Sequence, residues 1–355
     1  MLYRVKQRER GYALMTAAAC SIGIIAMTGL SVDLGRMYIA RNEAQTFADS
    51  AALTAAVQLD GTLAGLTRAR SAVTANTNRW HLGTTVFSGT KTEFATLQTG
   101  PWNANPASAA GVLFVRVRAT TNPPLYFIPI VAGSSRGQVD AASVAGQVPK
   151  TGFREGSFPF SPIAHDAADP NFGLVPGHLY TLRWAAEPKL HHSNVCEGDD
   201  IQSIIDAANA TGPERGFIEE SSAENIRQTI EADRMTRPLA VGDTVVMSGG
   251  AKQTQQDSIV NRVRQDTDLT ATTYAEYRAN RTGNGRRVIL APVNTWNPDY
   301  RVLGFAAFFL TEPSTYLAAN GGNKPFCAEY VGNYVQGSDH NGAGGPGAYV
   351  VRLVL

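Results

Sequence analysis

The order of hydrophobic and polar residues divides the first sixty positions into two helical parts that follow one another without a break. Residues 11–32 contain no charged side chain, and a run of this length can cross the apolar core of a bilayer as a helix. Asp60 and Gly61 form the first strong stop. The pattern predicts one helix over residues 12–59, about 70 Å long at about 1.5 Å per residue. Beyond residue 32 its apolar residues recur every three or four positions, the spacing of one helical face: Leu34, Met37, Tyr38, Ala44, Phe47, Ala48, Ala51, Ala52 and Ala55.

The uncharged run has the character of a membrane anchor. Basic residues stand directly before it, and basic residues ahead of a first span hold that end of the chain in the cytoplasm. We therefore expect a single span, with everything after Asp33 outside the cytoplasm, in the periplasm if the cell is Gram-negative. The preceding basic residues are Arg4, Lys6, Arg8 and Arg10, and the anchor residues are Gly11, Ile22, Ile24, Ile25, Leu30 and Val32.

Two other fates of this segment stay open. A cleaved secretory signal has a shorter apolar core and then a cleavage site in non-helical sequence, whereas the helical pattern here continues. A lipoprotein would be modified at Cys20, whereas the sequence after Cys20 stays apolar as far as Val32. Both observations favour a retained span.

The alanine-rich stripe beyond the span has two interpretations. Small residues allow the backbones of two helices to approach closely, so the stripe would suit contact with another subunit, including self-association. The same stripe would also suit packing on a sheet that the chain itself forms downstream. The sequence leaves both alternatives open.

The sequence of residues 61–150 predicts a helix and antiparallel strands that pack on the long helix. Residues 112–120 alternate in the manner of a half-buried strand, with Leu113, Val115, Val117 and Ala119 on one face. Asn122-Pro123-Pro124 breaks this strand. The other predicted elements are a helix over 62–78 and extended segments over 125–131 and 138–148.

The sequence of residues 151–355 predicts a separate mixed domain that is richer in strand than in helix. The fold class predicted for the whole chain is therefore α+β. We expect residues 320–347, which are rich in Gly and Asn, to form a long surface loop with Cys327 near its start. Ser221 and Glu224 have the spacing of a helix capping box. The predicted strands are 179–184, 243–247, 286–293, 302–310 and 348–355, and the predicted helices are 199–210, 221–235 and 255–266.

Net charge and cysteine content limit the functions that this chain can have. The formal net charge is +1 over 355 residues, without the basic excess of a nucleic-acid-binding protein. Among three cysteines, only Cys196 and Cys327 lie far downstream of the span. Outside the cytoplasm they would form a disulfide; the alternative is two unrelated free thiols.

Two short segments contain residues that ligate metals. His165, Asp166 and Asp169 lie close together between Pro and Gly residues, where a turn capped by the Asp side chains is the better interpretation. His192 and Cys196 have the spacing of a zinc-ligand pair but lack a second pair, and His191 would point to the opposite side of a strand. No P-loop, dinucleotide or hydrolase motif occurs. We therefore expect no catalytic residue, cofactor or bound metal.

The N-terminal region resembles the TadG-like (TadE/TadG-like) group of the bacterial Tad (Flp) pilus-assembly proteins. The resemblance rests on "RERG", the apolar span, "GLSVDLGRMYIARNEAQTFADSAALTAA" and "LDG". Its helix-interface motif is Asp33, Gly35, Arg36, Tyr38, Phe47, Ala48, Ala51 and Ala52. One departure is Thr16, the fifth residue after Gly11, where related pilin-type proteins carry Glu. The resemblance therefore does not imply cleavage after Gly11 or a role as the main pilin.

The resemblance implies a single-span inner-membrane protein with a large periplasmic part. We expect a non-enzymatic component of a pilus-assembly or secretion machine that contacts inner-membrane lipid and other proteins of that machine. Two alternatives remain: a periplasmic metal-binding protein or metal-dependent enzyme, and an envelope structural protein unrelated to pili.

Overall fold

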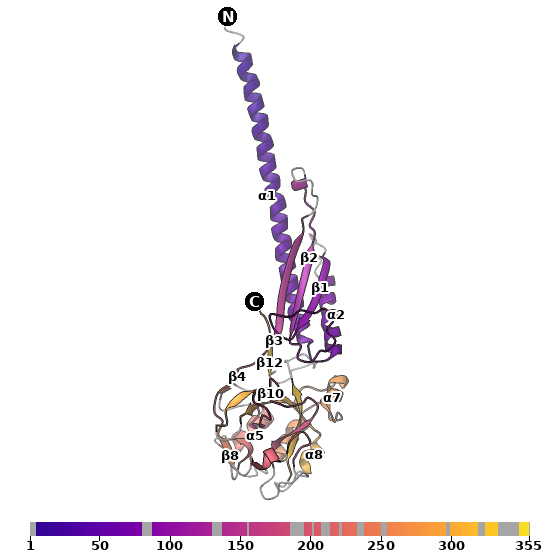
Figure 1. Ribbon diagram of the computed structural model, residues 1–355, viewed down its shortest axis with the longest axis vertical. Coiled ribbons are helices and arrows are strands. Elements are labelled where there is room, and N and C mark those ends of the chain that lie inside the picture. The colour runs from indigo at the N-terminus through magenta and orange to yellow at the C-terminus, as the bar shows by residue number, and fades with distance from the viewer. Residues whose placement is uncertain are drawn as a thin grey trace. The chain divides into compact units, whose positions relative to one another are not determined.

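The computed structural model describes most of the chain and divides it into two compact units (Figure 1). The first unit comprises residues 1–146 and 352–355, and the second comprises residues 147–351. The described residues are 5–79, 87–129, 137–154, 156–184, 195–200, 202–206, 214–219, 222–232, 238–249, 254–295, 299–318, 324–332 and 348–354.

The first unit begins with one uninterrupted helix, α1 (Val5–Val57). The helix starts before the uncharged run and ends two residues earlier than predicted. Helix α2 (Leu63–Arg79) follows after a short turn. The Thr62 hydroxyl caps α2 by accepting a hydrogen bond from the Gly65 amide at 3.1 Å, and Asp60 pairs with Arg68. The predicted stop at Asp60 and Gly61 is therefore where the chain turns back.

A four-stranded sheet covers one side of α1, with strand order β1-β2-β3-β12. In β2 (Phe114–Thr121) the predicted alternation holds, because Val115, Val117 and Ala119 are fully buried. Strand β2 packs on α1 and pairs antiparallel with both neighbours. The other strands are β1 (Phe87–Ala95), β3 (Val139–Pro149) and β12 (Tyr349–Leu353). Figure 1 shows the sheet beside the second half of α1, with the first half extending beyond it.

Two features of this unit differ from the sequence prediction. Strand β1 lies in a segment for which no strand was predicted. In the segment predicted to be extended, 125–131, the described part bends at residues 126 and 127 and is helical at 128 and 129, so it is not a strand. The physical reason is that its backbone amides donate to the Asp33 side chain instead of to a neighbouring strand.

The second unit is built on an antiparallel sheet with strand order β5-β11-β10-β9. In β10, Ala306, Phe308 and Leu310 belong to one hydrophobic cluster, and the residues between them belong to another. Successive side chains of a strand point to opposite faces, so both faces of this sheet are covered. The strands are β5 (Leu179–Arg183), β9 (Val288–Asn294), β10 (Val302–Leu310) and β11 (Phe326–Gly332).

Helices and two small sheets provide that cover. Helices α5 (Ala223–Ala232), α6 (Thr254–Arg264) and α8 (Pro313–Leu317) pack on the Phe308 face, and α7 (Tyr274–Asn280) packs on the Phe309 face. The small sheets pair β4 (Gly152–Phe153) with β7 (Leu239–Ala240) and β6 (Glu214–Ile218) with β8 (Met247–Gly249).

Three predictions in this unit need correction. The predicted loop 320–347 contains β11, an inner strand, so Cys327 lies in a strand. The strand predicted at 243–247 begins only at Met247. Of the helix predicted at 199–210, residues 202–206 are helical, whereas 199 and 200 are not. Ser221 lies outside the described residues; in its place the Ser222 hydroxyl accepts a hydrogen bond from the Asn225 amide at 3.1 Å.

Candidate membrane anchor and interface site

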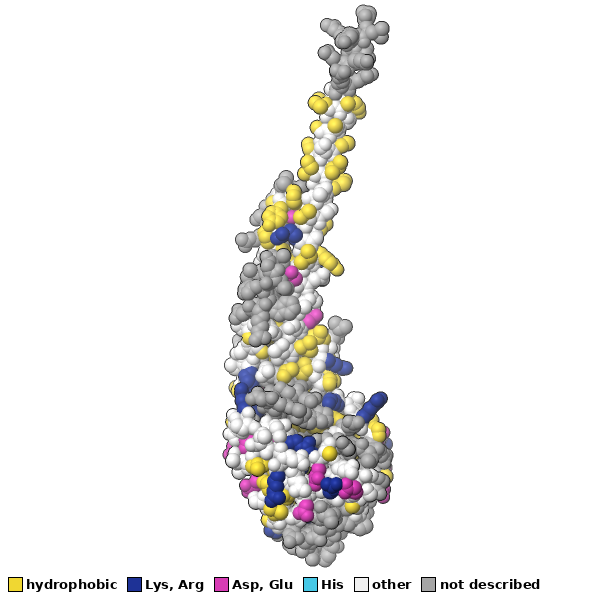
Figure 2. Space-filling model, turned by 180° about the vertical axis from the view of Figure 1, so that it is seen from behind, with side chains coloured by type: hydrophobic (Ala, Val, Ile, Leu, Met, Phe, Trp, Pro, Cys, Tyr) yellow, Lys and Arg dark blue, Asp and Glu magenta, His cyan; other side chains and the backbone are white. Residues whose placement is uncertain are grey.

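The first part of α1 exposes its apolar side chains. Ile22, Ile24 and Ile25 are between 63% and 69% exposed, and Tyr12, Leu14 and Met15 are more exposed still. Figure 2 shows hydrophobic side chains around this part of the helix, with no charged side chain among the described residues there. The helix is long and apolar enough to span a membrane. An apolar surface without protein cover is what a lipid-facing segment presents.

The polar side chains of this segment are satisfied inside the helix. A hydroxyl group in hydrocarbon needs a hydrogen-bond partner, because no water is available to it. Four hydroxyls donate to the carbonyl oxygen four residues earlier at 2.8–3.0 Å, namely those of Thr16, Ser21, Thr28 and Ser31. The Ser and Thr residues that dilute the apolar run are thus compatible with a span.

The second part of α1 is instead a core element of the first unit. Phe47, Ala48, Ala51 and Ala52 are fully buried, together with Ala44, Ala55 and Ala56. The elements that contact this helix most extensively are α2 and β2. Of the two interpretations of the alanine-rich stripe, the structure shows packing within the chain. That packing buries Phe47, Ala48, Ala51 and Ala52 within the chain, and self-association stays a prediction.

Asp33 marks the transition between these two parts. Its carboxylate is fully buried and accepts three backbone hydrogen bonds from the turn that follows β2. The amide of Tyr126 donates to Oδ1 at 2.9 Å, and the amides of Phe127 and Ile128 donate to Oδ2 at 2.7 and 2.6 Å. A carboxylate that accepts several amide hydrogen bonds makes strong, charge-assisted contacts. Asp33 therefore fastens the turn to α1.

Contacts on either side of Asp33 complete this site. A β-carbon added to Gly29 would overlap the Phe127 ring, so glycine allows the turn to lie against the helix. The Arg36 guanidinium lies 4.8 Å from the centre of the Tyr126 ring. The sequence motif contains Asp33 and Arg36, but the role of the 125–128 turn was missed. One feature of the sequence could have indicated this role. An aromatic segment follows Pro123 and Pro124, and two prolines disfavour continuation of the preceding strand.

Two residues of the predicted motif lie on the open side of α1. Gly35 is exposed, and a β-carbon added there would meet nothing within 4 Å. Tyr38 is 68% exposed and lines a shallow groove with Met37 and Arg41. The motif is therefore divided between residues that build the first unit and residues that face outward.

The predicted metal candidates do not form a cluster among the described residues. Asp166 and Asp169 each accept a hydrogen bond from the amide two residues later, as in a capped turn. His165 instead lies 3.0 Å from Asp199, whose other oxygen accepts from the Thr181 amide at 2.6 Å. His191 and His192 lie outside the described residues.

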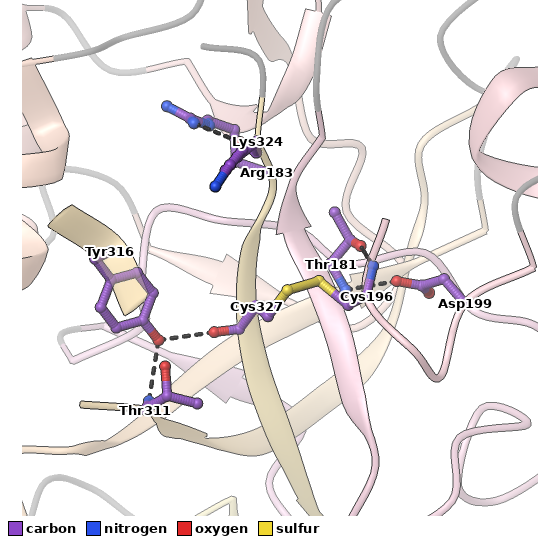
Figure 3. Close-up of a disulfide and its surroundings, with 8 residues drawn as sticks. All are labelled: Thr181, Arg183, Cys196, Asp199, Thr311, Tyr316, Lys324 and Cys327. Carbon is purple, nitrogen blue, oxygen red and sulfur yellow. Dashed lines mark hydrogen bonds between the residues drawn. A yellow bond between two sulfur atoms is a disulfide. The ribbon is translucent and has the colours of Figure 1, made fainter. Parts of the chain in front are cut away.

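Cys196 and Cys327 form a disulfide in the second unit (Figure 3). Cys327 belongs to β11, and the Cys196 amide donates to the Thr181 hydroxyl of neighbouring β5 at 3.1 Å. The Tyr316 hydroxyl donates to the Cys327 carbonyl oxygen at 2.7 Å. The bond links β11 to the segment beside β5.

Two buried charged residues of the second unit, Arg287 and Asp268, have structural partners. Arg287 is fully buried and donates to the carbonyl oxygens of Leu310 and Asp268, each at 3.0 Å. Burial alone would raise the pKa of Asp268, but hydrogen bonds from Asn280, Thr270 and Ala271 outweigh it and hold the pKa below its usual range. These contacts fix the loops around β9, and they leave Asp268 ionised at neutral pH.

Comparison with known families bears on α1. The family model described as "Putative Flp pilus-assembly TadE/G-like" matches residues 11–58. Neither the curated proteins nor the solved structures include a match to this sequence. The matched segment contains both the exposed apolar part of α1 and its buried alanine-rich part. This match over residues 11–58 is to the TadE/G-like family of Flp pilus-assembly proteins, and it supports the family predicted from the sequence.

Proposed function

We propose that this chain is a membrane-anchored, non-enzymatic component of a Tad/Flp-type pilus-assembly or secretion apparatus. In this proposal α1 crosses the inner membrane once, with the N-terminus in the cytoplasm. Both units lie in the periplasm and act there through contacts with other proteins of the apparatus. The observation that carries the proposal is that the TadE/G-like match coincides with a helix that is apolar and exposed in its first part.

Two further observations support the orientation. The residues before the span are basic, which favours retention of that end in the cytoplasm. The Cys196–Cys327 disulfide suits an oxidising compartment, and the periplasm is one.

Protease added to intact spheroplasts tests the topology. A C-terminal tag should be lost in intact spheroplasts, and a cytoplasmic marker should survive. A matched variant that lacks residues 1–32 should stay in the cytosol, resist the protease and contain reduced cysteines. A full-length chain that is protected in intact spheroplasts would contradict the proposed orientation.

Co-purification tests the assignment to a pilus or secretion machine. The chain, cross-linked in membranes and solubilised, should recover the ATPase and platform proteins of that machine. Recovery of envelope proteins alone would favour a structural role unrelated to pili. A stoichiometric metal that is lost on replacement of His165 by Ala would favour the metal-binding alternative.

A further inference from the structure

The turn at residues 125–128 lies beside the last helical turn of the uncharged run. Phe127 packs directly on Gly29, which lies three residues before Val32, the end of that run. Three residues correspond to about 4.5 Å along a helix axis. The Phe127 ring is therefore level with the end of the proposed span rather than with the aqueous region beyond it.

This turn exposes aromatic side chains within the first unit. Tyr126 is 58% exposed and Phe127 is 37% exposed, although both belong to large hydrophobic residue types. Leu34, on the neighbouring part of α1, is 52% exposed. Amphipathic aromatic rings such as Tyr are favoured at the boundary between the lipid tails and water. The exposed apolar side chains of the turn lie beside the span, because Phe127 packs against Gly29.

The backbone amides of the turn have hydrogen-bond partners within the protein, as a region that is poor in water requires. An amide without a partner costs several kcal/mol in hydrocarbon, which is why irregular backbone is rarely exposed to lipid. Here Asp33 accepts hydrogen bonds from three successive amides. Arg36 lies over the Tyr126 ring, and an arginine near a membrane boundary can extend its charged end toward water or phosphate.

From these contacts we infer that residues 125–128 form a second membrane contact, seated in the interfacial layer of the outer leaflet beside α1. The inference rests on the proposed single span, which sets the depth of Gly29. It assigns Asp33 the role of satisfying the turn's amides, and it assigns Tyr126 and Phe127 the lipid contact. Lipid is favoured over a protein partner because the exposed residues of α1 just before Gly29 face lipid in the same proposal. The first unit would then touch the membrane at two places and be held against rotation about α1.

Depth-dependent quenching of a fluorophore tests this inference in the full-length protein. Cys20→Ser removes the free thiol and leaves the Cys196–Cys327 disulfide intact. One cysteine is then placed at Tyr126, labelled with an environment-sensitive dye and reconstituted in phosphatidylcholine–phosphatidylglycerol vesicles. The quenchers are lipids with a nitroxide near the headgroup, lipids with a nitroxide at the tail end, and aqueous iodide. Tyr126 is largely exposed, so the labelled variant should fold.

Two matched labels calibrate the measurement. Ile22→Cys lies within the span, and Thr46→Cys lies on an exposed position of α1. Thr46 is about 20 Å beyond Asp33 along the helix. The Tyr126 label should lose most emission to the shallow nitroxide and less to the deep one, and it should be less sensitive to iodide than the Thr46 label.

Each other outcome refutes one specific claim. A Tyr126 label that behaves like the Thr46 label overturns the inference and leaves the anchor intact, provided that the deep nitroxide quenches the Ile22 label. A Tyr126 label shielded from both lipid and iodide overturns it as well, because protein would then cover the turn. An Ile22 label that neither nitroxide quenches refutes the proposed anchor, and with it this inference.

Discussion

Removal of the Cys196–Cys327 disulfide is expected to lower the free energy of unfolding of the second unit by several kcal/mol. The bond joins positions 131 residues apart. In a chain-entropy treatment, closing a loop of that length corresponds to about 5 kcal/mol at 25 °C, at the upper end of the about 2–5 kcal/mol found for native disulfides. The bond therefore stands for a large part of a typical domain's net stability.

The folded second unit should nevertheless survive without the bond. Strand β11, which contains Cys327, pairs with β5 on one side and with β10 on the other. These pairings hold the strand in register whether or not the sulfur atoms are joined. Removal of the disulfide should therefore act mainly by raising the entropy of the unfolded chain. The unfolding transition should shift to lower urea concentration, and the folded structure of the second unit should stay the same.

Urea unfolding of the full-length protein in detergent measures this effect. Unfolding of the second unit is followed by hydrogen exchange of peptides from β10, an inner strand. With a slope of about 2 kcal/mol per molar urea, a loss of about 4 kcal/mol moves the midpoint by about 2 M. Cys196→Ala with Cys327→Ala should show this shift, and Cys20→Ser should not.

A midpoint shift below about 0.5 M, equivalent to about 1 kcal/mol, would refute this reasoning. So would a wild-type curve that stays the same after treatment with dithiothreitol. Either result would mean that the two cysteines are not bridged in the protein, or that the unfolded chain keeps the two segments together without the bond.

Three other perturbations probe the first unit and the buried acid of the second. Phe47→Ala should destabilise the first unit by about 3–5 kcal/mol, because Phe47 is fully buried, whereas Thr46→Ala should change its thermal unfolding by less than about 0.5 kcal/mol. Asp33→Asn should speed hydrogen exchange of the amides at 126–128, because they lose a charged acceptor; unchanged exchange would contradict the fastening role. Since the pKa of Asp268 is lowered in the folded state, its contribution should be complete above about pH 4 and decrease as the pH falls further. Acid unfolding of Asp268→Asn should lack that decrease, and an unchanged acid profile would disprove it.

The order of hydrophobic and polar residues within one segment was enough to predict some elements correctly, namely α1 and β10. The uncharged run and the three-to-four residue spacing beyond it predicted α1 to within a few residues at its C-terminal end. Strand β10 was predicted with its observed bounds, because nine residues without a charge suit a strand that is buried on both faces. In each case the signal lies within one stretch of sequence.

Elements that depend on distant partners could not be predicted in this way. Strand β11 is stabilised by β5, which lies more than 140 residues earlier, and its sequence is flanked by Gly- and Asn-rich stretches that are typical of loops. The Asp33 site has the same origin, since its amide partners lie 93 to 95 residues downstream. A lone acid after an apolar run indicates that the run has ended, but it does not indicate which backbone the acid will bind.

The continuity of α1 bears on how the proposed anchor would act. A domain tethered to a membrane for mobility is usually joined by a Gly-, Ser- or Pro-rich linker. Here the same helix continues from the span into the buried core of the first unit, where Phe47 and Ala48 are fully covered. Displacement of the span would therefore move the sheet with it, because no flexible joint lies between Gly29 and the Ala-rich stripe. Such a rigid connection suits a protein that presents a fixed surface at the membrane better than one that reaches for distant partners.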